Sequence, residues 1–215
     1  MTESERPVRL YLASTSPARL ATLRAVGIDP IAIPSHVDEE AAVGGATLTP
    51  PELVLLLARL KAEAVAGAGP PGGGAFDGVI LGGDSAFELD GVVYGKPHLP
   101  EAARERWHAQ RGRAGLLHSG HWLIDSRDGI VGRAVGGTSV ATVRFAQDID
   151  DAEIDAYIAT GEPLEVAGAF TIDAKGAGFV ESIVGDPHTV VGLSVPLLRT
   201  LVRQLGIAWP SLWNT

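Results

Sequence analysis

The sequence of 215 residues contains no cysteine. This absence excludes disulfide bonds, zinc sites built on thiolates and a cysteine nucleophile. Long apolar runs are also missing, since none approaches the roughly 18 residues that a membrane-spanning helix needs. The first residues, MTESERPVRL, carry acidic side chains in place of the apolar core of a secretion signal. We therefore expect a cytoplasmic protein that has no membrane partner.

Positive charge is scarce as well. The chain has 17 Lys and Arg against 26 Asp and Glu, which gives a formal net charge of −9. Proteins that bind long nucleic acids regardless of sequence need many cationic side chains to neutralise phosphates, so we expect no such partner. A few cations gathered at one point still suffice to hold one small polyphosphate, especially together with a divalent metal ion.

What is present is the composition of a folded globular chain, with 46% hydrophobic and 20% charged residues. The length suits one domain, or one domain of two lobes. Strand and helix patterns alternate. Two hairpins, one through Asp90-Gly91 and one near Asp128-Gly129, favour a mixed sheet over a purely parallel one. We therefore expect an α/β fold.

The periodicity of apolar residues predicts the other elements. Capping boxes from Thr49 to Glu52 and from Asp150 to Glu153 mark two helix starts. The segment GAGPPGGGAFDG, residues 67–78, is expected to be a flexible surface loop. Helices are expected over residues 17–26, 53–66, 101–110, 151–160 and 194–205, and strands outside the hairpins over residues 8–13, 29–37, 168–173 and 178–184.

The stretch STSPAR follows the first strand and begins the first helix. Ser16 is a good N-cap, with Pro17 at the first helical position. The first N–H groups of a helix have no internal partner and carry partial positive charge. Ser14, Ser16 and Arg19 would therefore complete a site for an anion such as phosphate. The alternative is that Ser16 only caps the helix and that Arg19 is a solvated surface residue.

Asp84 follows a predicted strand that ends in Gly82 and Gly83. Its carboxylate is therefore expected at an exposed strand end, where α/β proteins usually place their chemistry. The alternative is a turn aspartate that binds its own backbone. Lys96 lies between a glycine and a proline at the exit of the first hairpin, so it is held more rigidly than an ordinary surface lysine.

Two further charged groups precede this strand. The acidic turn Asp38-Glu39-Glu40 offers oxygen ligands for Mg²⁺ or Mn²⁺, although acidic turns are usually only solvated. Lys61 falls near the end of a predicted helix, where a cation also suits the helix dipole. Neither group identifies a site by itself.

Three blocks of sequence stand in a characteristic order. They are LASTSPARLATLRAVGI, then GGDSAFELDGVVYGKP, then a last block from YIATGEPLEVAGAFTID to VVGLSVPLL. With the acidic turn and LARLKAEAVA between the first two, the sequence resembles the Maf family of nucleoside triphosphate pyrophosphatases over nearly its whole length. The corresponding family motifs are Ser-x-Ser-Pro-Arg-Arg, then Gly-Ala-Asp-Thr with a later Gly-Lys-Pro, then Tyr-x-x-Thr-Gly-Glu-Pro.

The resemblance implies a fold and a reaction. The fold is an elongated, two-lobed α/β fold of the Maf/ITPase-like type, one domain over residues 1–215 with a mixed central sheet, flanking helices and a central cleft. The reaction is metal-dependent hydrolysis of nucleoside triphosphates, non-standard or modified ones above all, to the monophosphate and pyrophosphate. The implied cofactor is Mg²⁺ or Mn²⁺.

The resemblance also assigns residues by position. Asp84 corresponds to the catalytic acid–base residue, and Glu39 together with Asp84 corresponds to the metal site. Lys61 and Lys96 correspond to cations that hold the triphosphate and assist catalysis. The other substrate-binding positions are Ser14, Ser16, Arg19, Ser85 and Asp173.

The chain departs from the family pattern at three positions. Ala18 replaces the first of two paired arginines and so removes a planar cation, whereas Ser85 replaces a threonine and keeps the hydroxyl. Asp173 stands where dTTP- and UTP-preferring members have a glutamine. An ionised aspartate only accepts hydrogen bonds, so it suits the N–H groups of guanine or cytosine better than the carbonyl oxygens of uracil. We expect a preference for such bases, unless Asp173 faces solvent.

Members of the family are also linked to septum formation and to arrest of cell division. The alternative function is therefore a nucleotide-binding regulator with little turnover, for which Ala18 leaves room. A nucleic-acid-binding module is disfavoured by the acidic balance of the chain. A homodimer is suggested by the resemblance alone.

Overall fold

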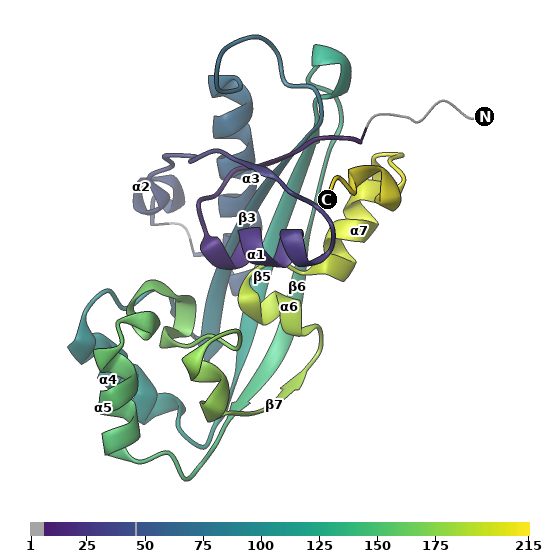
Figure 1. Ribbon diagram of the computed structural model, residues 1–215. Coiled ribbons are helices and arrows are strands. Elements are labelled where there is room, and N and C mark those ends of the chain that lie inside the picture. Colours follow the sequence, from purple (N-terminus) through teal and green to yellow (C-terminus); the bar gives the residue numbers. More distant parts are fainter. Residues whose placement is uncertain (1–6, 46) are drawn as a thin grey trace. The chain divides into compact units, whose positions relative to one another are not determined.

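The computed structural model describes residues 7–45 and 47–215 (Figure 1). None of the described helices is long and apolar enough to cross a membrane. The helices are α1 (Pro17–Ala25), α2 (Glu39–Val43), α3 (Pro50–Ala68), α4 (Pro100–Gln110), α5 (Asp151–Ala159), α6 (Pro187–Val191) and α7 (Val195–Gln204). The strands are β1 (Leu10–Leu12), β2 (Ile31–Ala32), β3 (Val79–Leu89), β4 (Val92–Tyr94), β5 (Ala114–Asp125), β6 (Ala134–Phe145) and β7 (Val180–Val184).

The described strands form one sheet of seven, in the order β2-β1-β3-β5-β6-β7, with β4 paired to β3. β1 is parallel to both of its neighbours, whereas β4 runs antiparallel to β3 and β7 antiparallel to β6. Asp90 and Gly91 have φ angles of 53° and 78°, as a type I′ hairpin turn requires. The α/β class, the mixed sheet and the first hairpin are thereby confirmed.

The chain divides into two compact units. The first contains the described residues up to Asp84 together with Gly120–Thr138 and Val195–Thr215. The second contains Ser85–Ser119 and Ser139–Ser194. The boundaries fall inside β3, β5 and β6, so each of these strands continues from one unit into the other. The predicted cleft concerns the mutual placement of two lobes and stays a prediction.

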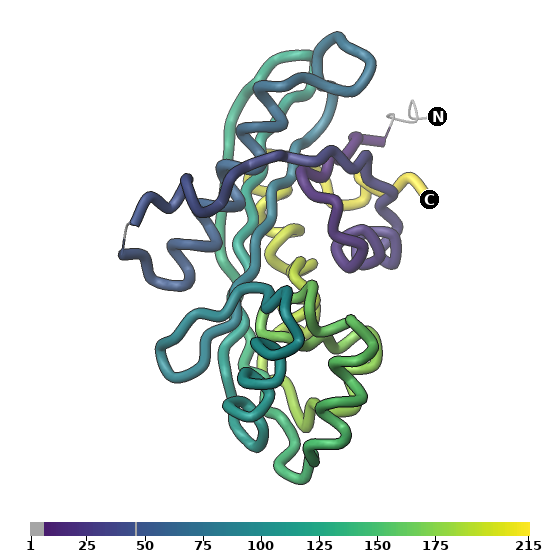
Figure 2. The backbone as a smooth tube through the Cα atoms, turned by 90° about the vertical axis from the view of Figure 1, so that its left-hand side faces the viewer, coloured from purple at the N-terminus to yellow at the C-terminus, as the bar shows by residue number. Residues whose placement is uncertain are grey.

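The two ends of the described chain lie side by side in the first unit (Figure 1, Figure 2). The backbone N–H of Val8 donates to the carbonyl of Ser211 at 2.7 Å, and that of Asn214 donates to Gly27 at 3.0 Å. The Asn214 side chain in turn accepts from the N–H of Asp29 at 2.7 Å. The segment after α7 is therefore fixed against the segment that leads out of α1.

Aromatic side chains form the core of the second unit. Phe87, Trp107, Phe145 and Phe170 are at most 2% exposed and meet edge to face, with ring centroids 4.8 to 5.9 Å apart. Such pairs each contribute about 0.5–1.5 kcal/mol beyond the burial of their surface. Trp107 Nε1 donates to the carbonyl of Ala169 at 2.9 Å, so the polar atom of the largest ring has a partner.

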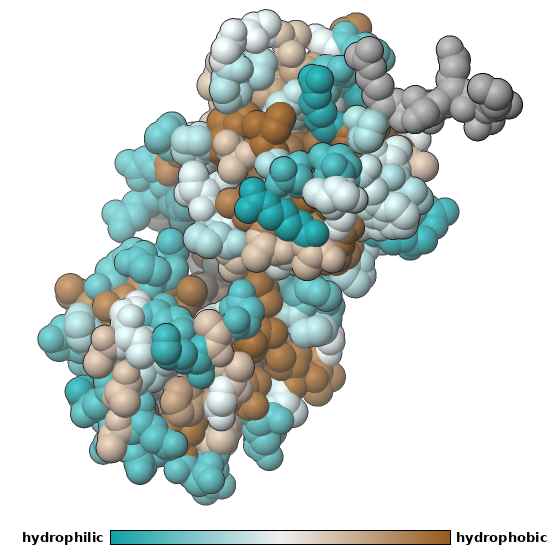
Figure 3. All heavy atoms as spheres, in the orientation of Figure 1, coloured by the Kyte–Doolittle hydropathy of each residue, from teal (hydrophilic) through white to brown (hydrophobic). Residues whose placement is uncertain are grey.

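Hydrophilic side chains gather on the outer face of α4 and α5 in the second unit (Figure 3). Arg104 pairs with Asp155, and Arg111 Nη1 lies 2.9 Å from Asp151 Oδ1. Exposed ion pairs of this kind contribute little to stability because water screens them. The buried faces of the two helices, which carry Trp107 and its neighbours, supply most of the attraction between them.

The predicted helix starts are confirmed by their caps. The Glu52 carboxylate accepts from the backbone N–H of Thr49 at 2.9 Å, and Asp150 and Glu153 exchange side-chain-to-backbone bonds of 2.8 and 3.0 Å. The predicted acidic turn is wrong, because Asp38 is itself the N-cap of α2 and accepts from the backbone N–H at position 41. Glu39 therefore lies in a first helical turn, where the dipole favours an acid.

The strand predicted over residues 168–173 is also wrong. A 3₁₀ turn, Ala167–Ala169, occupies its start, and Gly168 has a φ of 72° that no strand allows. The apolar residues here are buried in the aromatic core of the second unit without pairing in the sheet, with Ala169 and Phe170 at most 2% exposed. The segment has the apolar sequence pattern of a buried strand because its side chains are buried, although its backbone is irregular.

Glu162, from the TGEP stretch, ties this irregular segment to α5. Its Oε1 accepts hydrogen bonds from the Tyr157 hydroxyl at 2.8 Å and from the Gly176 N–H at 2.9 Å, and its Oε2 accepts from the Lys175 N–H at 3.2 Å. Burial raises the pKa of Glu162, but these hydrogen bonds outweigh it and hold the pKa below its usual value. Glu162 therefore stabilises the second unit as an ionised carboxylate.

We predict that Glu162→Gln destabilises the protein near neutral pH and much less in acid. Because folding lowers the pKa of Glu162, its contribution is fully present above the unfolded pKa of about 4.3 and is lost as pH falls through the folded value. The Tm values of wild type and variant, measured by circular dichroism, should differ most near pH 7 and converge in acid. Glu165→Gln, at an exposed position, is the control. A Tm difference that is independent of pH would contradict the prediction.

Candidate active site

The start of α1 gathers two hydroxyl groups and a guanidinium. Ser16 is the N-cap, since its Oγ accepts from the backbone N–H of Arg19 at 3.4 Å. Ser14 Oγ accepts from the Ser16 N–H at 3.2 Å and from Arg19 Nη1 at 3.3 Å. The first turn adds N–H groups without helical partners and the positive end of the dipole. Arg19 is thus held in place, and its interpretation as a solvated surface residue is wrong.

Asp84 lies inside a strand and not past its end, which corrects the sequence prediction. β3 continues from Val79 to Leu89, and Asp84 is only 8% exposed. The two glycines before it do not form a turn. They allow other parts of the chain to approach the strand closely. A Cβ atom on Gly83 would lie 3.3 Å from Arg19 Nε, so the guanidinium passes directly over this glycine, beside Asp84.

Gly82 lets the backbone of α3 approach β3. A Cβ atom at this position would lie 2.0 Å from the carbonyl oxygen of Ala58, a distance that no side chain tolerates. Gly120 on β5 makes the same allowance, because its Cβ would lie 2.3 Å from the carbonyl oxygen of Val54. Lys61 is three residues after Ala58, on the same face of the helix. It therefore points at β3 where Asp84 stands.

Lys61 links two carboxylates. Its Nζ lies 2.6 Å from Asp84 Oδ1 and 2.7 Å from Glu39 Oε1, and the residue is 9% exposed. Its charge is balanced by these acids and not by the helix dipole, since α3 continues as far as Ala68. The first unit thus brings together six predicted site residues, Ser14, Ser16, Arg19, Glu39, Lys61 and Asp84.

The cluster contains two cations and two acids in a largely desolvated place. Burial raises the pKa of Asp84, against the charges of Lys61 and Arg19, which lower it. Burial likewise lowers the pKa of Arg19, while Asp84 and Glu39 act in the opposite direction. Each charge is therefore stabilised mainly by the others. A polyanion that arrives with a bound cation adds both signs of charge, so the charges of the cluster stay balanced when it binds.

The donor atoms fit a divalent cation of the magnesium type. Glu39 and Asp84 contact the same ammonium group, so their carboxylates lie close enough to share an ion. Mg²⁺ is usually held by one or two carboxylates together with waters and substrate phosphates. Within the described ranges, no group of three or more His, Asp or Glu could hold a metal ion.

Residues 9–205 match the family model described as Maf-like protein. The chain belongs to the Maf-like family. A protein of Leifsonia xyli subsp. xyli is 65% identical, over 96% of this chain and 97% of its own, and one of Saccharopolyspora erythraea is 48% identical, over 96% and 98%. Both are named nucleoside triphosphate pyrophosphatase. The solved structure of the Staphylococcus aureus Ham1 protein matches 92% of this chain and 99% of the Ham1 chain. The sequence identity is 13%, and the TM-score is 0.46.

The remaining motif positions of this Maf-like chain lie in the second unit. The Lys96 side chain is 54% exposed, and its Nζ lies 4.0 Å from a glutamate oxygen. Ser85 Oγ lies 2.9 Å from Ser119 Oγ. Asp173 is exposed, as the alternative of a solvent-facing residue predicts, and it accepts a hydrogen bond from the hydroxyl of Thr171. The roles that the family assigns to these three residues stay predictions.

A set of hydrogen-bonded hydroxyl groups lies beside Ser85 within the second unit, and sequence reasoning missed it. Ser119 Oγ donates to the carbonyl of Thr189 at 2.9 Å, and Thr189 Oγ1 lies 2.7 Å from Ser139 Oγ. Because Ser119 gives its one proton to that carbonyl, Ser85 is the donor in the bond between the two serines. The signal in the sequence that points to Ser119 is a polar residue in the middle of the largely buried strand β5.

We predict that Gly82→Ala destabilises the protein and moves Lys61 away from Asp84, because the added methyl group would meet the backbone of α3. Overpacking of this kind costs about 1–3 kcal/mol. Gly67→Ala is the matched control, since it lies on α3 with nothing within 4 Å of its Cβ position. It should stabilise the helix by up to about 1 kcal/mol. Urea unfolding measures the change in the free energy of unfolding for both variants. An unchanged free energy of unfolding for Gly82→Ala would contradict the packing argument.

Proposed function

We propose that this chain hydrolyses nucleoside triphosphates to the monophosphate and pyrophosphate. The observation that supports this most directly is the contact of Lys61 with both Asp84 and Glu39, beside Arg19 and the start of α1. These groups have the chemistry to bind a polyphosphate that carries a cation. They occur in a chain whose relatives are named nucleoside triphosphate pyrophosphatase.

Charge stabilisation is the first requirement of the reaction. When water attacks the α-phosphorus and pyrophosphate leaves, negative charge accumulates on the phosphate oxygens. Arg19 and the first N–H groups of α1 bind these oxygens, and Lys61 neutralises part of the charge. Because Arg19 is desolvated, its attraction to phosphate exceeds that of an exposed arginine. Lys96 has the same role in this proposal.

Asp84 is the group that orients the attacking water and takes its proton. The new bond joins the water oxygen to the α-phosphorus, and the bond to the pyrophosphate oxygen breaks. Burial raises the pKa of Asp84, which makes its carboxylate a stronger base than that of an exposed aspartate. The hydrogen bond of 2.6 Å from Lys61 fixes the orientation of this carboxylate.

A divalent cation, Mg²⁺ or Mn²⁺, belongs to the proposal, with Glu39 and Asp84 as its protein ligands. When bound, it supplies positive charge to the phosphate oxygens. Glu39 begins α2, and its side chain is 50% exposed. It can therefore exchange Lys61 for the ion without disturbing buried packing.

We predict that Asp84→Asn retains nucleotide binding and loses roughly 10²- to 10⁴-fold in kcat, because an amide cannot take up the proton. Calorimetric titration measures binding, and chromatography of the products measures turnover. Asp29→Asn, at an exposed ion pair with Arg24, is the matched control. Full activity of Asp84→Asn would contradict the assignment of the base.

The products themselves test the reaction. Monophosphate plus pyrophosphate supports attack at the α-phosphorus, whereas diphosphate plus orthophosphate contradicts it. Nucleotide binding without turnover in the wild type would support the alternative, a nucleotide-binding regulator. Ala18→Arg, which restores the second cation of the family motif, would then show whether that departure is the cause.

The base is selected by Asp173 in this proposal. Its carboxylate is exposed and is oriented by the hydrogen bond from Thr171. A carboxylate in that position accepts from the N–H groups of guanine or cytosine and repels the carbonyl oxygens of thymine and uracil. Guanine-type bases, modified ones included, and cytosine are therefore the substrates that we propose.

We predict that kcat/KM for GTP, 7-methyl-GTP or CTP exceeds that for dTTP. Asp173→Gln should move the ratio toward dTTP by roughly 10-fold, because a glutamine both donates and accepts. Asp148→Gln, an exposed aspartate of the same unit, is the control. A preference of the wild type for dTTP would contradict the role of Asp173 while leaving the reaction itself intact.

A further inference from the structure

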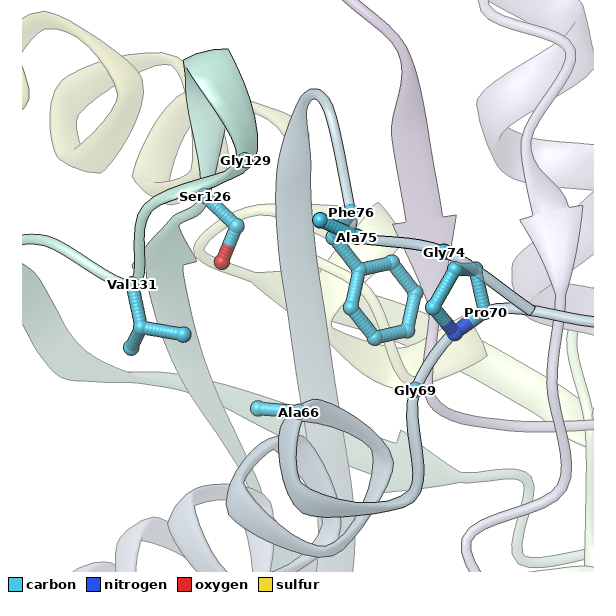
Figure 4. A pocket seen from close by; sticks show the side chains of 9 residues that line it. All are labelled: Ala66, Gly69, Pro70, Gly74, Ala75, Phe76, Ser126, Gly129 and Val131. Atoms are coloured by element: carbon cyan, nitrogen blue, oxygen red, sulfur yellow. The ribbon is translucent and has the colours of Figure 1, made fainter.

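The glycine-rich loop after α3, residues 69–78, borders a half-open pocket that the proposed function does not use. The pocket lies in the first unit, between the end of α3, this loop and the turn that follows β5 (Figure 4). It offers about 190 Å³ of space. Its walls include the side chains of Ala66, Pro70, Ala75, Phe76, Ser126 and Val131.

Three successive glycines of this loop are not explained by packing. Gly72, Gly73 and Gly74 have φ angles of 84° to 90°, and a Cβ atom on any of them would meet nothing within 4 Å. Their conformation keeps the loop arched over the pocket, because side chains that require negative φ would fold it differently. The segment predicted to be a flexible surface loop therefore forms one wall of the pocket.

The chemistry of the walls restricts the charge of an occupant. The residues that line the pocket are alanine, glycine, proline, valine, phenylalanine and one serine, so none of them carries a charge. A charged ligand would lose part of its hydration here without gaining a partner of opposite sign. The occupant is therefore neutral and mainly apolar.

Ser126 supplies the one polar side chain. It is 1% exposed, and its Oγ has no hydrogen-bond partner. Its backbone N–H is satisfied by the carbonyl of Gly78 at 2.8 Å, so the hydroxyl alone is left without a bond. Figure 4 shows this side chain directed into the pocket. A buried hydroxyl without a partner is unfavourable, and a ligand that bonds to it removes the penalty.

Phe76 indicates the shape of the occupant. One side of its ring meets Tyr11 edge to face, with centroids 4.8 Å apart, and another side forms a wall of the pocket. A further ring in the pocket would extend this edge-to-face stacking. Apolar cavities of about 150 Å³ in other proteins hold benzene. The space here is therefore enough for one ring and a small substituent.

We propose that this pocket binds a small neutral aromatic molecule with one hydrogen-bonding group, of the chemical class of phenol. The ring packs against Phe76, and the hydroxyl of the ligand bonds to Ser126 Oγ. The pocket is separate from the cluster of Lys61, Asp84 and Glu39, since it shares no residue with it.

Phenol and toluene test the proposal, because they have nearly the same shape and only phenol has a hydroxyl group. Each compound is titrated into the full chain, and binding is measured from the amide chemical shifts. Both should shift the signals of residues 66–76 and 126–131. Ser126→Ala, which keeps the shape of the pocket, should weaken phenol binding about 5-fold and leave toluene binding unchanged. Without ligand, this variant should have a Tm equal to or above that of wild type, because it removes an unsatisfied hydroxyl.

Ala66→Leu fills the pocket and should abolish binding of both compounds. Ala68→Leu, the same change at an exposed position of the same helix, should bind both as wild type does. The proposal is overturned if wild type shows no shifts with either compound, or if Ser126→Ala leaves the ratio of the two affinities unchanged. Ser126→Ala decides this last point even if Ala66→Leu fails to fold.

Discussion

The close approach of α3 to β3 is the constraint on which the first unit depends. A helix and a strand come this near only if no side chain stands between their backbones, and Gly82 meets that condition against the carbonyl of Ala58. The consequence is chemical as well as structural, because Lys61 then reaches Asp84 with a hydrogen bond of 2.6 Å. A larger residue at position 82 would separate Asp84 from Lys61.

Desolvation follows from that closeness and gives the cluster its properties. The Asp84 carboxyl has a raised pKa because it is buried, yet Lys61 and Arg19 keep the ionised form accessible. Such opposition between burial and partner charges is typical of groups that exchange protons during a reaction. The same desolvation strengthens the attraction of Arg19 for any anion that approaches it. The close packing of α3 on β3 therefore sets the pKa of Asp84 and the strength of the charge interactions around it.

α3 organises more than the cluster around Lys61. Its first turns pack against β5 at Gly120, its middle carries Lys61 to Asp84, and its end at Ala66 borders the pocket beneath the glycine-rich loop. The second unit is stabilised differently, by edge-to-face aromatic rings and by the ionised Glu162. Substitutions in that aromatic core should therefore act on stability before they act on the chemistry of the cluster.

Local sequence determined the features whose cause is local. Ser16 as a helix cap, the hairpin at Asp90-Gly91 and the α/β class follow from backbone preferences and periodicity within a few residues, and the ordered blocks indicated the family. Gly82-Gly83 predicts a strand end and residues 168–173 predict a strand, and both predictions are wrong. In both cases burial against distant parts of the chain decided the outcome.

Tertiary structure alone decided which charges meet. Nothing near Arg19 in the sequence shows that its guanidinium lies over Gly83, and nothing near Ser126 shows that its hydroxyl has no partner. The residues concerned are tens of positions apart, and their contacts depend on how closely whole elements pack. Short-range patterns record which residues prefer a helix or a strand, whereas the partners of a buried polar group are fixed only when the chain has folded around it.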